Sequence, residues 1–155
     1  ELDLDRLKKE FGDEYVIVLR THYYVVDALD LTPYKGFVYN GSVYNDIARL
    51  YLISDVLITD YSSEFFDYAN LRRPMIFFMY DLEKYRGTLR GFYFDAEAEL
   101  PGPILQTNDE MVDAIRHLDQ IEVDYKEKYD AFYDKYCAWE AGTSTEKVVK
   151  AVFGK

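Results

Sequence analysis

The chain has 155 residues, 49% of them hydrophobic and 30% charged, and a formal net charge of −11 at pH 7. This size and composition predict one globular domain over residues 1–155, with a hydrophobic core and no membrane span. The acidic balance argues against binding of nucleic acid and against membrane contact through this segment, and the single cysteine, Cys137, argues against a disulfide or a zinc cluster.

The first predicted elements alternate between helix and strand. Apolar spacing predicts a helix over 4–11, strands over 15–19 and 37–39, and a helix over 46–53 capped by Asn45 or Ser42. Asp3 and Asp5 form the Asp-x-Asp pattern that some glycosyltransferases use for a metal, but helix capping explains this short pattern better. We therefore predict no metal site.

The stretch SDVLITDYSSEFFDYANLRRP, from Ser54 to Pro74, predicts the centre of the fold. An apolar run at 56–58 gives way to polar residues and then to helical spacing. Pro74 blocks further helix before a second apolar run over 75–79. Strand, loop, helix and strand form one βαβ unit, which predicts an α/β, Rossmann-like parallel sheet flanked by helices.

The C-terminal half is predicted to be mainly helical, with residues 119–155 as C-terminal helices. In chain order we expect a helix from 80 to before Gly87, an ordered loop over 88–103 and a strand at 104–105. A helix opened by a Thr107–Glu110 capping box follows, and then a long helical stripe from Leu118 to Tyr136 that Gly142 stops. The last predicted helix covers 146–153 and is opened by a Thr143–Glu146 box.

Ser62 and Ser63 follow the central strand at the start of its helix, where hydroxyls and free backbone N–H groups can hold a phosphate. Their alternative role is to cap the helix. Asp60 at the strand end can organise the loop or bind a ligand hydroxyl. Asp67, one helical turn beyond Ser63, can reach a ribose hydroxyl or instead pair with a neighbouring arginine.

His22 follows the strand over 15–19, and Arg20 lies two residues before it, on the same side of an extended chain. Together they can hold a pyrophosphate, or His22 can move a proton while Arg20 stabilises charge. The alternative is a histidine that is merely hydrogen-bonded at a strand end. Arg90, beside a glycine in the predicted loop, is a further phosphate-binding candidate, with a surface ion pair as its alternative.

Three stretches of the chain resemble the CDP-glycerol glycerophosphotransferase family, the teichoic acid primases and polymerases of Gram-positive bacteria. They are RTHYYV from Arg20, VYNDIARLYLISDVLITDYSSEFFDYANLRRPMIFFMYDLEKYR from Val43 and LRGFYFDAEAELPGPI from Leu89. The resemblance implies a GT-B fold of two Rossmann-like halves, of which this chain is similar to the C-terminal, donor-binding half. It also implies a catalytic or pyrophosphate-binding role for His22 and a donor-binding role for the segment 60–63.

The activity implied by this resemblance is transfer of glycerol phosphate from CDP-glycerol to a teichoic acid chain, with release of CMP and without a cofactor. The implied partners are the donor, the glycerol phosphate acceptor and an N-terminal half that this sequence lacks. The implied location is cytoplasmic, on the inner face of the cell membrane. Because the sequence opens on Glu1 rather than Met, we expect a piece of a longer protein.

Two other functions fit the same sequence. The chain can be half of a CDP-ribitol or nucleotide-sugar transferase, which changes the substrate and keeps the fold. It can also be a non-catalytic nucleotide-binding or docking module.

Overall fold

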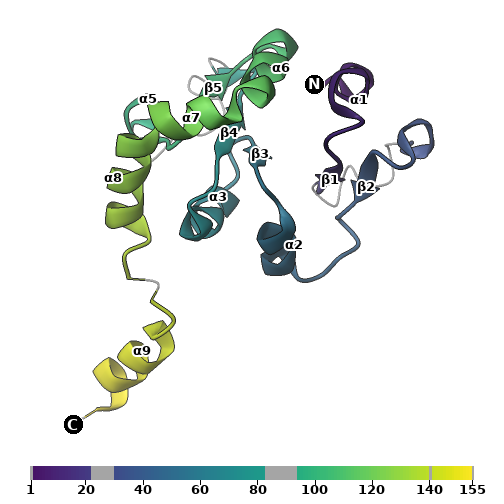
Figure 1. The fold of residues 1–155 in the computed structure, drawn as a ribbon. Coiled ribbons are helices and arrows are strands. Elements are labelled where there is room, and N and C mark those ends of the chain that lie inside the picture. Colours follow the sequence, from purple (N-terminus) through teal and green to yellow (C-terminus); the bar gives the residue numbers. More distant parts are fainter. Residues whose placement is uncertain (1, 22–29, 83–93, 140, 155) are drawn as a thin grey trace.

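The computed structural model describes residues 2–21, 30–82, 94–139 and 141–154 (Figure 1). The strands in these ranges are β1 (Ile17–Leu19), β2 (Val38–Asn40), β3 (Leu57–Thr59), β4 (Met75–Phe78) and β5 (Ile104–Leu105). They form two parallel sheets, β1 with β2, and β3, β4 and β5 in that order. Parallel strands require crossover connections, so the predicted α/β class with flanking helices is confirmed.

The helices are α1 (Leu4–Phe11), α2 (Ile47–Ile53), α3 (Glu64–Tyr68), α5 (Ala96–Glu99), α6 (Asn108–Arg116), α7 (Leu118–Asp124), α8 (Lys126–Tyr136) and α9 (Ser144–Phe153), with 3-10 turns η2 (Thr32–Tyr34) and η3 (Ala69–Leu71). The helix predicted to follow residue 80 lies mostly outside the described residues. Two predictions were wrong: α5 lies within the predicted loop, and the helical stripe of 118–136 is broken at Tyr125 into α7 and α8, long before Gly142.

Helix caps explain where several of these helices begin. Asp3 caps α1 through a bond from the Arg6 backbone N–H, and Thr107 with Glu110 forms the predicted capping box of α6. Asp46 caps α2, so the prediction of Asn45 or Ser42 was wrong. The box predicted for α9 does not form, because the Thr143 side chain makes no capping bond.

Strand β4 lies at the centre of the core, because both of its faces are buried. Alternate residues of a strand point to opposite faces. Met75 and Phe77 accordingly belong to a cluster with Phe65 and Phe132, from α3 and α8. Ile76 and Phe78 belong to a second cluster, with Leu7, Met111 and other residues from α1 and α6. The sheet is therefore sandwiched between two helical layers.

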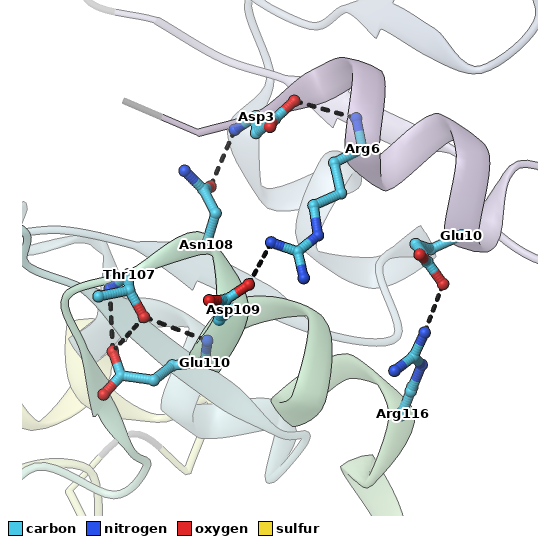
Figure 2. Close-up of polar contacts among 8 residues, drawn as sticks. All are labelled: Asp3, Arg6, Glu10, Thr107, Asn108, Asp109, Glu110 and Arg116. Carbon is cyan, nitrogen blue, oxygen red and sulfur yellow. Dashed lines mark hydrogen bonds and ion pairs between the residues drawn. The ribbon is translucent and has the colours of Figure 1, made fainter.

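Polar contacts between α1 and α6 tie the N-terminal elements to the rest of the molecule (Figure 2). The Asp3 backbone N–H donates to Asn108 Oδ1 at 2.9 Å, Arg6 pairs with Asp109, and Arg116 pairs with Glu10. Figure 1 shows α1 leading directly into β1. This junction therefore helps to position the carboxyl end of β1 relative to β3 and β4.

Candidate functional site

The turn between β3 and α3 is held by three side-chain hydrogen bonds. Asp60 Oδ1 accepts from the Ser62 backbone N–H at 3.1 Å, which is an Asx turn. The buried Thr59 hydroxyl donates to Glu64 Oε1 at 2.9 Å. The Tyr61 hydroxyl donates to Asp81 Oδ1 at 2.8 Å, and burial with this bond raises the pKa of Tyr61. The loop predicted to hold a ligand is thus fixed by strand, helix and the segment after β4.

The two serines lie at the predicted place, but they differ from the prediction in detail. Both side chains are exposed, and Ser63 is the residue before α3, with no side-chain capping bond. The Ser62 backbone N–H is bonded to Asp60, so the prediction that it is free was wrong. Helix α3 has only 5 residues, so its dipole is small, and an anion here needs help from other groups.

Arg20 supplies a cation at the carboxyl end of β1. Its Nη1 donates to the Tyr44 carbonyl at 2.8 Å and to the Gly41 carbonyl at 3.3 Å, so the loop before α2 orients the guanidinium. A guanidinium carries five N–H donors, and these two bonds leave donors for a ligand. Next to it, the Thr21 backbone N–H donates to Ser42 Oγ at 3.0 Å. His22, the predicted catalytic residue, follows directly but lies outside the described residues, as does Arg90.

Asp67 is exposed on α3. The two arginines considered as its partners are engaged elsewhere: Arg72 pairs with Asp130, and Arg73 Nη1 donates to the Leu52 and Ser54 carbonyls at 2.9 and 2.6 Å. The ion pair proposed as an alternative role for Asp67 is therefore not with either of these arginines. A role toward a ribose hydroxyl stays a prediction.

A groove of about 420 Å³ separates β1 from β3. Its walls are mostly apolar, and its polar lining residues are Glu14, Arg20, Ser54, Asp55 and Glu64. Because Arg20 directly follows β1 and Glu64 is the first residue of α3, the groove brings the predicted cation and the start of α3 to one place. Ligands of parallel α/β sheets bind at this edge.

Tyr51 of α2 also lines the groove, and sequence reasoning gave it no functional role. Its side chain is 9% exposed, and its hydroxyl is buried without a hydrogen-bond partner in the structure as described. Burial, with smaller contributions from the charges of Glu64 and Asp67, raises the pKa of Tyr51 to about 12. The phenol is thus protonated at neutral pH and able to donate. The available sequence signal was only a tyrosine on the inward stripe of α2.

Two features are absent from the described ranges. They contain no group of three or more His, Cys, Asp or Glu side chains able to hold a metal ion. None of their helices has both the length and the apolar character needed to span a bilayer.

Comparison with known proteins places the chain in a family. Residues 1–154 match the family described as CDP-Glycerol:Poly(glycerophosphate) glycerophosphotransferase. A teichoic acid poly(glycerol phosphate) polymerase of Bacillus subtilis (strain 168) is 52% identical over 153 residues, which cover 99% of this chain and 20% of that protein. A teichoic acid poly(ribitol-phosphate) polymerase of Bacillus spizizenii is more distant, at 39% identity over 97% of this chain and 24% of its own length.

A solved structure of the wall teichoic acid polymerase TagF, in a variant soaked with CDPG, superposes with a TM-score of 0.88 at 49% identity. The match covers 94% of this chain and 36% of that one. The chain therefore spans well under half the length of the relatives it matches. Because the family match extends over residues 1–154, the chain belongs to the CDP-glycerol:poly(glycerophosphate) glycerophosphotransferase family.

Proposed function

We propose that this chain is the donor-binding half of an enzyme that moves glycerol phosphate from CDP-glycerol to a growing teichoic acid chain, with release of CMP. The observation that carries the proposal is the family match over residues 1–154, together with 52% identity to a poly(glycerol phosphate) polymerase. The proposed acceptor is the glycerol phosphate end of that chain. We expect the acceptor and part of the catalytic machinery to require a second half of the enzyme.

In this proposal the donor diphosphate lies between the carboxyl end of β1 and the start of α3. Arg20 and the hydroxyls of Ser62 and Ser63 bind its oxygens, and Asp60 holds the turn that presents the two serines. The groove that Arg20 and Glu64 both line supports this placement. Asp67 binds a ribose hydroxyl. His22 and Arg90 have the roles predicted from the sequence, a catalytic or pyrophosphate contact and a phosphate contact.

The reaction is a phosphoryl transfer. The acceptor hydroxyl oxygen forms a bond to the phosphorus that carries glycerol, and the bond from that phosphorus to the bridging oxygen of the diphosphate breaks. CMP leaves with the electron pair, and His22 shields or protonates its phosphate. Such transfers depend mainly on positioning and charge stabilisation, and Arg20 supplies positive charge where it develops. The base that takes the acceptor proton comes from the other half.

A CDP-ribitol donor is the second candidate, because a poly(ribitol-phosphate) polymerase is also related to this chain. The higher identity to the glycerol phosphate enzyme, 52% against 39%, favours glycerol.

We also propose that the parent enzyme works in the cytoplasm at the inner face of the membrane, in keeping with its teichoic acid substrate. The acidic charge of this chain, −11, supports membrane contact through another segment.

The proposal is tested by assaying the full-length enzyme with CDP-glycerol, CDP-ribitol and a nucleotide sugar. Turnover with CDP-glycerol is expected to be fastest, and fastest turnover with another donor would replace the proposed substrate.

His22→Ala should lower turnover at least ~10²-fold, with His117→Ala as the matched control, since His117 is an exposed helix-end residue. A His22→Ala rate near the wild-type rate would remove His22 from the mechanism.

A further inference from the structure

The loop between β2 and α2 is fastened to the end of β1 by hydrogen bonds that continue the parallel ladder. The paired strands end at Leu19 and Asn40, and the Gly41 backbone N–H then donates to the Leu19 carbonyl at 2.8 Å. One step further, the Thr21 backbone N–H donates to Ser42 Oγ at 3.0 Å. The Ser42 side chain therefore takes the place of a backbone acceptor and extends the contact beyond the two strands.

The loop itself holds the Ser42 side chain in this position. The Ser42 backbone N–H donates to Asn40 Oδ1 at 2.9 Å, which closes an Asx turn. Gly41, between these two residues, is buried, and a Cβ there would lie 2.8 Å from Val18 Cγ1 and 3.3 Å from Leu50 Cδ1. Because Gly41 has no side chain, the loop can approach β1 closely. The loop thus has a fixed geometry relative to β1.

This loop also holds the Arg20 guanidinium, through the Tyr44 carbonyl at 2.8 Å and the Gly41 carbonyl at 3.3 Å. Arg72 and Arg116 differ, because each of them pairs with a carboxylate. Carbonyl oxygens carry no net charge, so the two bonds of Arg20 orient its guanidinium and leave its positive charge in place. The Arg20 side chain is exposed at the carboxyl edge of β1, where its remaining N–H donors can meet an anionic ligand.

We infer that Ser42 is a positioning residue for the phosphoryl transfer and that it acts through Arg20. Its hydroxyl anchors the loop to Thr21, and the anchored loop presents the two carbonyls that aim the guanidinium. A guanidinium that is held in advance loses less side-chain freedom when it binds, and it stabilises charge at one place during transfer. The inference rests on the proposed function, because it assumes that Arg20 binds the donor diphosphate.

The test measures kcat and KM for CDP-glycerol with the full-length enzyme. Ser42→Ala removes the acceptor of the Thr21 N–H, so kcat/KM should fall about tenfold, whereas Ser42→Thr keeps a hydroxyl and should retain most of the wild-type value. Asn40→Ala opens the Asx turn and should cause a smaller loss in the same direction. Val43→Ala is the matched control from the same loop, because the Val43 side chain is 75% exposed, and it should leave both constants unchanged.

A double-mutant cycle with Arg20→Ala tests whether Ser42 acts through the guanidinium. Arg20→Ala should lower kcat/KM more than Ser42→Ala does, because it removes the charge itself. In the Arg20→Ala background, Ser42→Ala should then lower kcat/KM by less than about twofold, since the group that it positions is gone. A purely structural role of Ser42 would give the same loss in both backgrounds.

The outcomes separate this inference from the proposed function. If Arg20→Ala is slow but Ser42→Ala keeps the wild-type kcat/KM, the inference is overturned and the proposed donor site stands. The same conclusion follows if the two losses multiply in the double variant, or if Ser42→Thr loses as much as Ser42→Ala. A wild-type rate for Arg20→Ala would overturn the placement of Arg20 in the proposed function, and the inference with it.

Discussion

Asp60 is the residue that shapes the turn between β3 and α3. Its carboxylate accepts the Ser62 backbone N–H, and so fixes how the two serines face solvent. Asp60→Ala removes this acceptor, and we expect it to lower the free energy of unfolding by about 1 kcal/mol and the affinity for CMP about tenfold. Urea unfolding and calorimetric titration measure the two effects.

Asp60→Asn is the matched control for that change, because asparagine keeps the side-chain oxygen that closes the turn. We expect its stability and CMP affinity to stay close to those of wild type. If Asp60→Asn loses as much CMP affinity as Asp60→Ala, the charge of Asp60 acts on the ligand directly. Closing the turn would then not explain the loss of CMP affinity.

Gly102 shows how a single missing side chain permits the contact between β4 and β5. A Cβ at this position would lie 2.0 Å from the Met75 carbonyl oxygen and 2.9 Å from its carbon, and backbone cannot move aside as a flexible side chain can. Gly102→Ala should therefore destabilise the fold by about 1–3 kcal/mol, the usual cost of overpacking. Thermal unfolding measures the effect, with Ser62→Ala, a substitution at an exposed site, as the reference.

Helix α6 depends on its capping box, and this gives the stability of the chain a defined pH dependence. Glu110 accepts from the backbone N–H groups of Gln106 and Thr107 and from the Thr107 hydroxyl, and these bonds hold its pKa below the ordinary 4.5. A carboxyl whose pKa is lowered by folding stabilises the fold above its unfolded pKa, and this contribution is lost as the pH falls through the folded value.

Glu110→Gln keeps the shape of the side chain and removes its charge. Urea unfolding should show it less stable than wild type at about pH 6, and the difference should shrink as the pH falls through the lowered pKa of Glu110 and the wild-type carboxylate becomes protonated. Thr107→Ala, which removes the cap itself, should cost about 1 kcal/mol. A stability difference for Glu110→Gln that does not change as the pH falls would show that the charge is irrelevant to the cap.

The sequence predicts the strongly patterned elements well and misses those that depend on tertiary contacts. The apolar run of β4 and the Thr107–Glu110 box are local signals, and both are confirmed. Asp46 was missed as a cap because Asn45 beside it is an equally good capping residue. Helix α5 has 4 residues, too few to show a period, and the stripe after Leu118 continues its apolar spacing across the break at Tyr125.

The candidate site divides in the same way. Asp60, Ser62 and Ser63 were placed by a local pattern, the junction of strand and helix, and the structure has that junction. Tyr51 and the groove were not predictable, because the groove exists only where β1 and β3, 40 residues apart along the chain (Ile17 to Leu57), lie side by side without pairing. Roles for His22 and Arg90 still rest on the sequence alone.

Across the whole molecule, the N-terminal elements are held to the larger sheet by the contact of α1 with α6. Leu7 is 2% exposed within the second core cluster, whereas the Arg116–Glu10 pair lies at the surface. Leu7→Ala should therefore cost about 2–5 kcal/mol. Glu10→Ala, the matched control from the same helix, should cost less than about 1 kcal/mol.

This comparison also bears on function, because α1 leads into β1 and therefore helps to place Arg20 (Figure 1). If the junction positions the site, Leu7→Ala should weaken CMP binding under conditions where the variant remains folded. A Leu7→Ala variant with wild-type CMP affinity would show that the donor site lies wholly on β3, β4 and α3. A large stability loss in Glu10→Ala would instead assign the junction to its polar contacts.

We propose that a cytidine nucleotide binds where the carboxyl ends of β1 and β3 meet the start of α3. A crystal structure of the chain with CMP tests it most directly. We expect the phosphate to lie within hydrogen-bond distance of Arg20 and of Ser62 or Ser63. CMP bound elsewhere on the molecule, with this corner filled only by solvent, would contradict it.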